Sequence, residues 1–139
     1  MATDKLSEGI KRHIDGWELI AEKNRDFNLG DEVVKNLFYD REHSRLNIIF
    51  SQNYGDPTSD EVPEQEVLLF QCYGVEDVNC GFMRENDYIQ SVCYRDLGDA
   101  VQVIIYCAGM SFVTERIVVM RLPWLDAVQK LFDRNKQFY

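Results

Sequence analysis

Positively charged residues are missing from one long segment of this chain, since no Lys or Arg occurs between Leu46 and Met83. The acidic residues of the same segment are Asp56, Asp60, Glu61, Glu64, Glu66, Glu76 and Asp77. Over the whole chain, 24 acidic and 15 basic side chains give a formal net charge of -9. A charge of this sign repels phosphate backbones and anionic membrane surfaces and attracts cationic proteins. We therefore expect a basic protein partner and no direct binding of nucleic acid or membranes.

Long apolar runs are also missing. No stretch approaches the roughly 18 apolar residues of a membrane span, and Met1 to Ile10 lacks the apolar core of a signal peptide. We therefore expect a cytoplasmic protein. The hydrophobic content of 45% is too high for a disordered chain, and 139 residues are enough to bury a core without a disulfide or metal. The sequence thus predicts a single domain over residues 1–139.

Residue sets that carry catalysis or bind metals are scarce. The four cysteines show no C-x-x-C spacing, which argues against a zinc site or a disulfide framework. Cys72 shares its strand parity with Leu68 and Phe70, as a buried residue would. The histidines are His13 and His43, and neither has an activating partner at a recognisable spacing. We expect a protein without enzymatic activity, cofactor or bound metal.

The segment from Gln52 to Gln65 is predicted to be a loop, because its glycine and proline residues interrupt strands. Its carboxylates do not follow the ligand spacing of a calcium-binding EF-hand. Two interpretations remain for this acidic loop. It is either a solvated segment that keeps the protein soluble, or a docking surface for a basic partner with Tyr54 as an aromatic anchor.

The amino-terminal segment has the apolar spacing of one helix face. Apolar residues recur there at intervals of three and four, namely Leu6, Ile10, Ile14, Trp17 and Ala21. Gly9 and Gly16 each destabilise a helix by about 1 kcal/mol relative to Ala, so this helix is expected to depend on packing against the rest of the domain. A partner-binding helix would have the same apolar face, and this alternative remains.

Period-two alternation replaces the helical pattern after Gly30. Val33, Leu37 and Tyr39 lead into a charged turn at residues 40–44, and alternating apolar residues from Leu46 to Phe50 follow it. This pattern predicts an antiparallel hairpin. Further strands are predicted at Glu66–Tyr73, Tyr88–Tyr94, Ala100–Cys107 and Phe112–Leu122, separated by turns that contain glycine.

A second amphipathic helix is predicted after the last strand. Pro123 stops that strand and suits the first position of a helix, and the apolar face that follows consists of Trp124, Val128, Leu131 and Phe132. Strands that follow one another without intervening helices form antiparallel sheets. We therefore predict an α+β fold, in which an antiparallel β-sheet of about six strands has an N-terminal and a C-terminal helix packed on it.

A family resemblance rests on the segments Val67-Leu68-Leu69-Phe70, Gly74-Val75-Glu76-Asp77-Val78 and Gly81-Phe82, followed by Asn86 and Ile89. Over roughly Glu66 to Ile89 the chain resembles some small immunity proteins of bacterial polymorphic toxin systems, in which a strand leads into a Gly-Val turn with a carboxylate. The resemblance implies a small, acidic, cytoplasmic protein that covers the active site of a toxin domain. A toxin that acts on nucleic acid has a basic site, for which an anionic surface would compete with the substrate.

These patterns favour protein binding without catalysis. We predict an immunity or inhibitor protein that masks the active site of a basic toxin or nucleic-acid enzyme. The predicted partner-binding residues are Tyr54, Asp56, Asp60, Glu61, Glu64, Glu66, Glu76 and Asp77. The alternative is a cytoplasmic chaperone or adaptor subunit that dimerises and holds a partner through its apolar helices. A small enzyme that uses carboxylates alone is a third interpretation, and both a monomer and a homodimer are compatible with the sequence.

Overall fold

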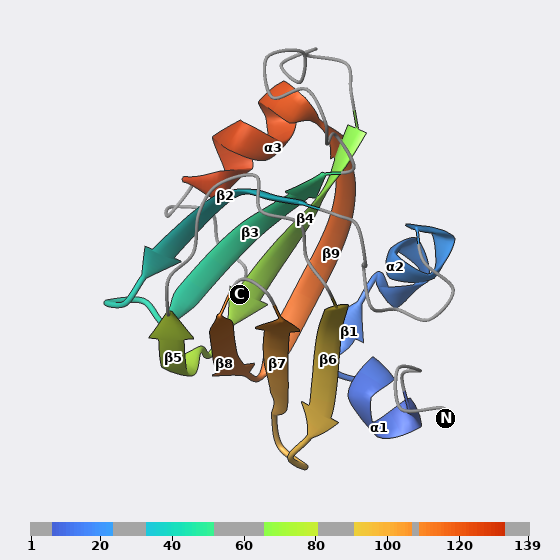
Figure 1. Cartoon of the computed structure of the whole chain (residues 1–139), viewed down its shortest axis with the longest axis vertical. Helices are drawn as coiled ribbons and strands as arrows, with labels where there is room; N and C mark the ends of the chain where they lie inside the picture. Colours follow the sequence, from blue (N-terminus) through green and yellow to red (C-terminus); the bar gives the residue numbers. More distant parts are fainter. Residues whose placement is uncertain (1–6, 24–32, 52–65, 81–90, 107–108, 133–139) are drawn as a thin grey trace.

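The computed structural model describes residues 7–23, 33–51, 66–80, 91–106 and 109–132. These residues form nine strands and three helices, with the strands arranged in two sheets (Figure 1). In chain order the elements are α1 (Glu8–Lys11), β1 (Ile14–Asp15), α2 (Trp17–Lys23), β2 (Val33–Asp40), β3 (Arg45–Ser51), β4 (Glu66–Tyr73), β5 (Glu76–Cys80), β6 (Ser91–Asp96), β7 (Val101–Tyr106), β8 (Met110–Thr114), β9 (Arg116–Pro123) and α3 (Trp124–Leu131). The fold is α+β, as predicted, and consists mostly of sheet.

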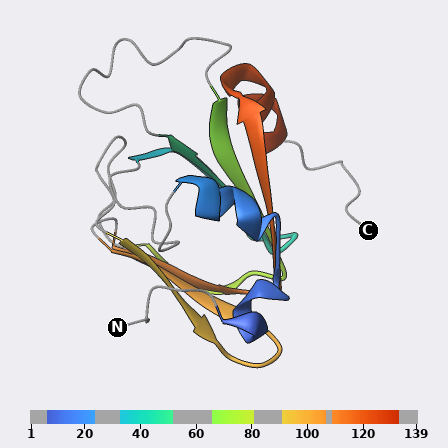
Figure 2. The same cartoon turned by 90° about the vertical axis from the view of Figure 1, so that its right-hand side faces the viewer.

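The strands form two sheets rather than the single sheet that was predicted. The first sheet has the order β1-β9-β4-β3-β2, and the second sheet has the order β5-β8-β7-β6. Neighbouring strands are antiparallel, except that β1 runs parallel to β9 with Ile14 opposite Ile117. Figure 2 shows the two sheets inclined to each other like the sides of a wedge. The prediction of about six strands in one sheet is therefore wrong in strand number and in layering.

The boundary between the sheets falls inside a segment that was predicted as one strand. Phe112–Leu122 is divided between β8 and β9, which belong to different sheets, and Glu115 lies between them. Buried positions change parity at this point, from even-numbered residues in β8 to odd-numbered residues in β9. The prediction failed because the sequence on both sides of Glu115 favours a strand equally, and the change of sheet is a tertiary feature.

The main core lies between the two sheets. Leu46, Phe50 and Phe70 contribute from the first sheet, and Val103 and Phe112 contribute from the second. The rings of Phe50 and Phe70 pack edge to face with centroids 4.7 Å apart. A smaller core lies on the other face of the first sheet, beneath α3, and consists of Ile49, Val67, Leu69, Ala127 and Leu131. Both faces of β3 are therefore covered, so every residue of this strand is buried, including the polar ones.

The amino-terminal segment is not one continuous helix. It forms α1, the short strand β1 and α2. Gly16, between β1 and α2, has a φ of +87°, and a Cβ atom built on it would lie 2.5 Å from the carbonyl oxygen of Val119. The chain therefore bends sharply against β9 at a residue that needs no side chain. Ile10 and Ile14 are buried in the main core, which confirms that the apolar stripe is a tertiary contact.

Other predicted elements are confirmed. The hairpin corresponds to β2 and β3, and β4 has the predicted bounds. The turn after β6 is closed by a hydrogen bond from Leu97 N to Ala100 O of 2.9 Å. Pro123 was predicted at the first position of the last helix. It is instead the N-cap of α3, so the helix begins one residue later, at Trp124. The predicted loop at Gln52–Gln65 lies outside the described residues.

Two weakly acidic side chains are buried in or against the main core. Burial raises the pKa of the Cys72 thiol above its ordinary value of 9.0, and the charge of Arg45 offsets part of this effect. Burial also raises the pKa of Tyr94 above its ordinary value of 10.0, with smaller effects from Cys72 and Cys93. Although the Tyr94 residue as a whole is only half-buried, its hydroxyl oxygen is fully buried and has no hydrogen-bond partner among the described residues.

The close approach of Gly16 to β9 predicts different effects of alanine at two glycines with positive φ. Gly98 has a φ of +91° and nothing within 4 Å of a built Cβ atom, so Gly98→Ala is expected to cost only the left-handed backbone strain of about 1–2 kcal/mol. Gly16→Ala adds a clash with the Val119 carbonyl, and we expect a further loss of about 1–3 kcal/mol. Urea denaturation measures both. Equal losses would show that the Gly16 contact tolerates a side chain.

The buried Tyr94 hydroxyl predicts that Tyr94→Phe stabilises the protein. Removing a buried hydroxyl that has no partner should raise the free energy of unfolding by about 1 kcal/mol at pH 7. Because the folded state disfavours the ionised forms of Tyr94 and Cys72, stability is fully present below their ordinary pKa values and falls as the pH rises above them. Tyr94→Phe should therefore reduce the loss of stability above pH 10. Urea denaturation across pH measures this, with exposed Tyr106→Phe as control; a destabilised Tyr94→Phe protein would contradict it.

Candidate partner-binding site

The predicted partner-binding residues fall into three groups. Those outside the described residues are Tyr54, Asp56, Asp60, Glu61 and Glu64. Glu66 is the first residue of β4, whereas Glu76 and Asp77 begin β5. All three of these described carboxylates are exposed, so each is available to a partner.

Glu66 lies at the opposite end of β4 from the other two residues. β4 has eight residues, and a strand of this length spans about 25 Å. Glu66 also pairs with Arg121, at 3.4 Å between Oε1 and Nε, with side chains that are 58% and 40% exposed. An exposed pair of this kind adds little stability, but the cation offsets the negative charge of Glu66. The structure therefore separates Glu66 from the surface formed by Glu76 and Asp77.

Glu76 and Asp77 lie beside the turn of the β2–β3 hairpin. The backbone nitrogen of Val75 donates a hydrogen bond to Ser44 O at 3.0 Å, which joins the start of β5 to this turn. Figure 1 shows β5 next to the closed end of the hairpin. The turn carries the exposed residue Glu42. Glu42, Glu76 and Asp77 are named the acidic corner below.

Glu76 and Asp77 can also have a structural role, because they lie on β5. β5 is an edge strand, and its pairing with β8 shifts register between Glu76 and Asn79. Asp77 has a φ of 54°, a left-handed conformation that Asp tolerates better than most residues. Charges and bulges on an edge strand prevent it from pairing with strands of other molecules. The carboxylates can therefore protect an edge, bind a partner, or do both.

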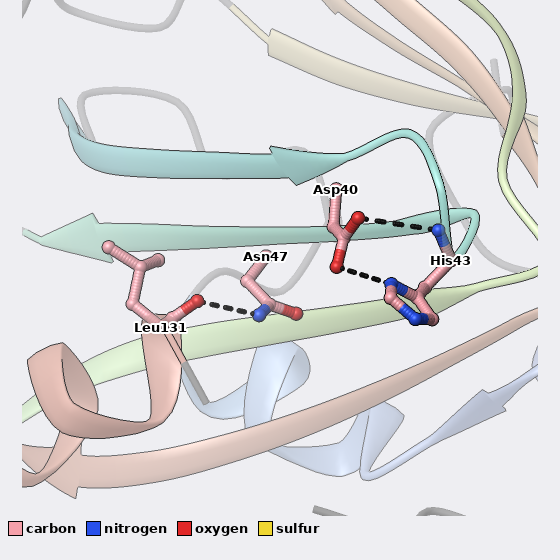
Figure 3. Close-up of polar contacts among 4 residues, drawn as sticks. All are labelled: Asp40, His43, Asn47 and Leu131. Carbon is pink, nitrogen blue, oxygen red and sulfur yellow. Dashed lines mark hydrogen bonds and ion pairs between the residues drawn. The ribbon is translucent and has the colours of Figure 1, made fainter. Parts of the chain in front are cut away.

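The hairpin turn contains an Asp–His pair that was not predicted from the sequence. The side chain of Asp40 is 5% exposed and that of His43 is 51% exposed. Asp40 Oδ2 lies 2.9 Å from His43 Nδ1, and Asp40 Oδ1 accepts the backbone N–H of His43 at 3.3 Å (Figure 3). Spacing in the sequence suggested no partner for His43, whereas the structure places Asp40 against its ring. The signal of this pair in the sequence is an Asp three residues before a His in a turn, where Asp commonly accepts local backbone bonds.

A carboxylate that binds Nδ1 fixes the orientation of an imidazole, as it does in catalytic triads and in metal sites. One ligand atom each from Asp40, Glu42 and His43 lies within 4.8 Å of the others, so the turn has the donor types of a cation site. His13 differs, because its Nδ1 lies 3.0 Å from Glu115 O and its Nε2 lies 3.1 Å from Gly98 O. Both nitrogens of that ring contact backbone carbonyls.

Asn47 connects the first sheet to α3. Its side chain is buried in β3, and Nδ2 donates a hydrogen bond of 2.8 Å to the carbonyl oxygen of Leu131 at the end of α3 (Figure 3). The last carbonyls of a helix have no partner within the helix, so this bond satisfies one of them. Asn47 Oδ1 is buried and has no hydrogen-bond partner among the residues described here. The contact fixes the helix over the smaller core.

No protein-family model and no curated protein matches the sequence. A similar solved structure is described as an uncharacterized protein from Neisseria gonorrhoeae. The TM-score is 0.46 at 7% sequence identity, and the match covers 65% of this chain and 90% of that chain. This similarity is too low to support an argument about function. In the described part of the chain, no helix is long and apolar enough to cross a membrane.

Because Asn47 bonds to the end of α3, we predict that Asn47→Ala weakens the packing of this helix on the first sheet. The substitution leaves the Leu131 carbonyl buried without this donor, and we expect the free energy of unfolding to fall by about 1–3 kcal/mol. Urea denaturation measures the loss, and amide hydrogen exchange should show faster exchange in α3. Asn79→Ala, at an exposed position of β5, is the control and should change stability by less than about 0.5 kcal/mol. Unchanged exchange in α3 would mean that the smaller core alone holds the helix.

Proposed function

We propose that the protein is a non-catalytic module that binds and inhibits a basic protein partner, such as a toxin domain or a nucleic-acid enzyme. The observation that carries this proposal is the acidic corner. Glu42, Glu76 and Asp77 are exposed together on a hairpin turn and an adjoining strand, in a chain with a net charge of -9. The backbone that carries these carboxylates is joined by the hydrogen bond from Val75 N to Ser44 O, which lowers the ordering cost of binding.

The expected mechanism is competition for a basic active site. An enzyme that acts on nucleic acid binds phosphates with Lys and Arg side chains. A group of carboxylates carries the same negative charge as the phosphates and can bind to these side chains. Attraction between opposite charges also speeds association, and this effect weakens as salt is added. The resemblance of the segment Glu66–Ile89 to immunity proteins of polymorphic toxin systems agrees with this mode of action. Glu76 and Asp77 of the acidic corner directly follow the Gly-Val turn of that segment.

The adaptor alternative receives less support from the described helices. A dimerising adaptor would present apolar helix faces to a partner. Ile10 and Ile20, however, are buried in the main core, and Leu131 of α3 is buried in the smaller core. Two large apolar residues are exposed near the carboxyl-terminal helix, Leu125 at 53% and Phe132 at 55%. The Phe132 ring packs edge to face against Phe38 with centroids 5.3 Å apart. Most of the apolar helix surface described here thus serves the fold of the chain itself.

Charge reversal at the acidic corner is expected to weaken partner capture. The test is affinity capture from a lysate of the source organism at low and high salt, followed by binding measurements with the purified partner. The double variant Glu76→Lys with Asp77→Lys should lower affinity by roughly tenfold or more, mainly through slower association. Asp99→Lys is the control, because Asp99 is also exposed but lies in the turn between β6 and β7. It should have little effect.

The acidic loop is tested in the same assay. Replacement of Asp60, Glu61 and Glu64 by Lys should leave the fold intact and weaken capture if this loop belongs to the binding surface. If neither set of variants changes capture, the carboxylates serve solubility and edge protection, and the proposal fails. Retention that is insensitive to salt, together with a dimer in size-exclusion chromatography, would support the adaptor instead. Inhibition itself is measured as loss of the partner's activity when the unmodified protein is added.

A further inference from the structure

We propose that the turn between β2 and β3 binds a divalent transition-metal ion through Asp40, Glu42 and His43. The three residues come from one four-residue segment, and one potential ligand atom of each lies within 4.8 Å of the others. This set differs from a purely acidic cluster, because it places an imidazole nitrogen and a carboxylate oxygen against each other. The site shares Glu42 with the acidic corner, but the proposal does not rest on the binding of a basic protein.

The distance between the first two donors fits neighbouring ligands of one ion. His43 Nδ1 and Asp40 Oδ2 are 2.9 Å apart. Two ligands that are each about 2.1 Å from a metal ion are about 3.0 Å apart at right angles and about 3.4 Å apart at the tetrahedral angle that Zn²⁺ prefers, so the two atoms must separate by about 0.5 Å to bind Zn²⁺. An ion at this distance from both atoms lies to one side of the line that joins them, so the imidazole must turn to direct its Nδ1 lone pair at the ion. The 51% exposure of the His43 side chain leaves room for this turn. Glu42 is exposed, so its carboxylate is free to move the short distance needed to become the third ligand.

Asp40 is held in a fixed position for this role. Its side chain is 5% exposed, and its other oxygen, Oδ1, accepts the backbone N–H of His43 at 3.3 Å. The backbone N–H of His43 also donates to Asp40 O at 3.2 Å. Because one carboxylate oxygen is engaged by the backbone, the other is directed toward the imidazole. Metal ligands held by hydrogen bonds in this way lose less entropy on binding.

The protonation of His43 must change when the ion binds. Without metal, Nδ1 donates to Asp40 Oδ2 in the tautomer that carries the ring proton on Nδ1. Coordination requires the Nδ1 lone pair, so the ring proton must reside on Nε2, with the displaced proton lost to solvent if the ring was charged. His43 is 51% exposed, which gives the ring access to water for this exchange. The ion then lies between one imidazole and two carboxylates, with water completing its coordination.

The donor set selects the class of ion. Calcium and magnesium prefer oxygen ligands only, whereas Zn²⁺, Ni²⁺ and Co²⁺ accept an imidazole nitrogen together with carboxylates. Two carboxylates balance the charge of a divalent ion. Arg45 lies opposite Asp40 in the register of β2 and β3, and Arg41 lies in the turn itself. These cations oppose binding, so the affinity should be lower than that of a buried structural zinc site.

The two histidines of the chain allow a direct test by NMR of the full-length protein. Zn²⁺ is titrated while the imidazole nitrogen signals of both residues are followed. We expect the His43 signals to shift and saturate, with the larger change at Nδ1. His13 is the internal control, because both of its ring nitrogens already contact backbone carbonyls. Saturating shifts at His13 alone, or no shift of His43 at millimolar Zn²⁺, would overturn the proposal.

Calorimetry of variants assigns the ligands. His43→Gln should lower Zn²⁺ affinity at least tenfold, and Glu42→Gln should lower it severalfold. Both residues are exposed, so neither change is expected to unfold the protein. Asp99→Asn removes an exposed carboxylate elsewhere and should leave the affinity unchanged. Equal affinity of the His43→Gln protein would show that Zn²⁺ binds elsewhere, for example at the half-buried thiol of Cys93, and would refute the site.

Discussion

The carbonyl oxygen of Tyr73 is the point at which the two sheets are joined. It accepts the backbone N–H of Glu115 at 3.0 Å and the hydroxyl of Thr114 at 2.7 Å. Both passages of the chain from one sheet to the other occur here, from β4 to β5 and from β8 to β9. A strand that leaves its sheet gives up ladder hydrogen bonds, and buried backbone groups must then find other partners. Thr114, fully buried, supplies one of them.

The position of the acidic corner follows from this junction. Gly74 takes a φ of +65° directly after Tyr73, and the chain turns into β5 beside the hairpin. The side chain of Glu115 lies so close to Gly74 that a Cβ atom there would be 2.7 Å from it. A side chain at Gly74 would therefore displace the Glu115 side chain and be strained by the positive φ.

The face of the first sheet that points away from the second sheet has an apolar half and a polar half. α3 covers the apolar half, while Asp40, Arg45 and Gln71 lie buried nearer the hairpin end. The guanidinium carbon of Arg45 lies 4.7 Å from the centre of the Tyr73 ring, a cation–π contact. Buried polar groups of this kind specify a single arrangement when they are satisfied and are costly when they are not. Asn47 lies between the two halves and bonds to the end of α3, so the polar half also sets where the helix stops.

Local sequence patterns were sufficient to predict some helices and strands and insufficient to predict others. β4 and α3 are predictable because apolar residues run between clear interruptions, Gly74 in one case and Pro123 in the other. The division at Glu115 and the break at Gly16 have no comparable signal, since each depends on a contact with a distant strand. The same holds for the site. Glu76 and Asp77 were predicted as partner-binding residues, but their place beside the β2–β3 turn depends on the hydrogen bond from Val75 N to Ser44 O, which joins residues far apart in the sequence.

Charge at this corner links the two proposed activities. A divalent ion bound by Asp40, Glu42 and His43 would place positive charge beside Glu76 and Asp77 and engage one of the three corner carboxylates. A basic partner would then meet a weaker negative surface. By thermodynamic linkage, a bound partner would lower the affinity for the ion by the same factor. The ion and the partner therefore compete through charge even where they contact different atoms. The factor by which one lowers the affinity for the other measures how near the partner's cations come to the turn.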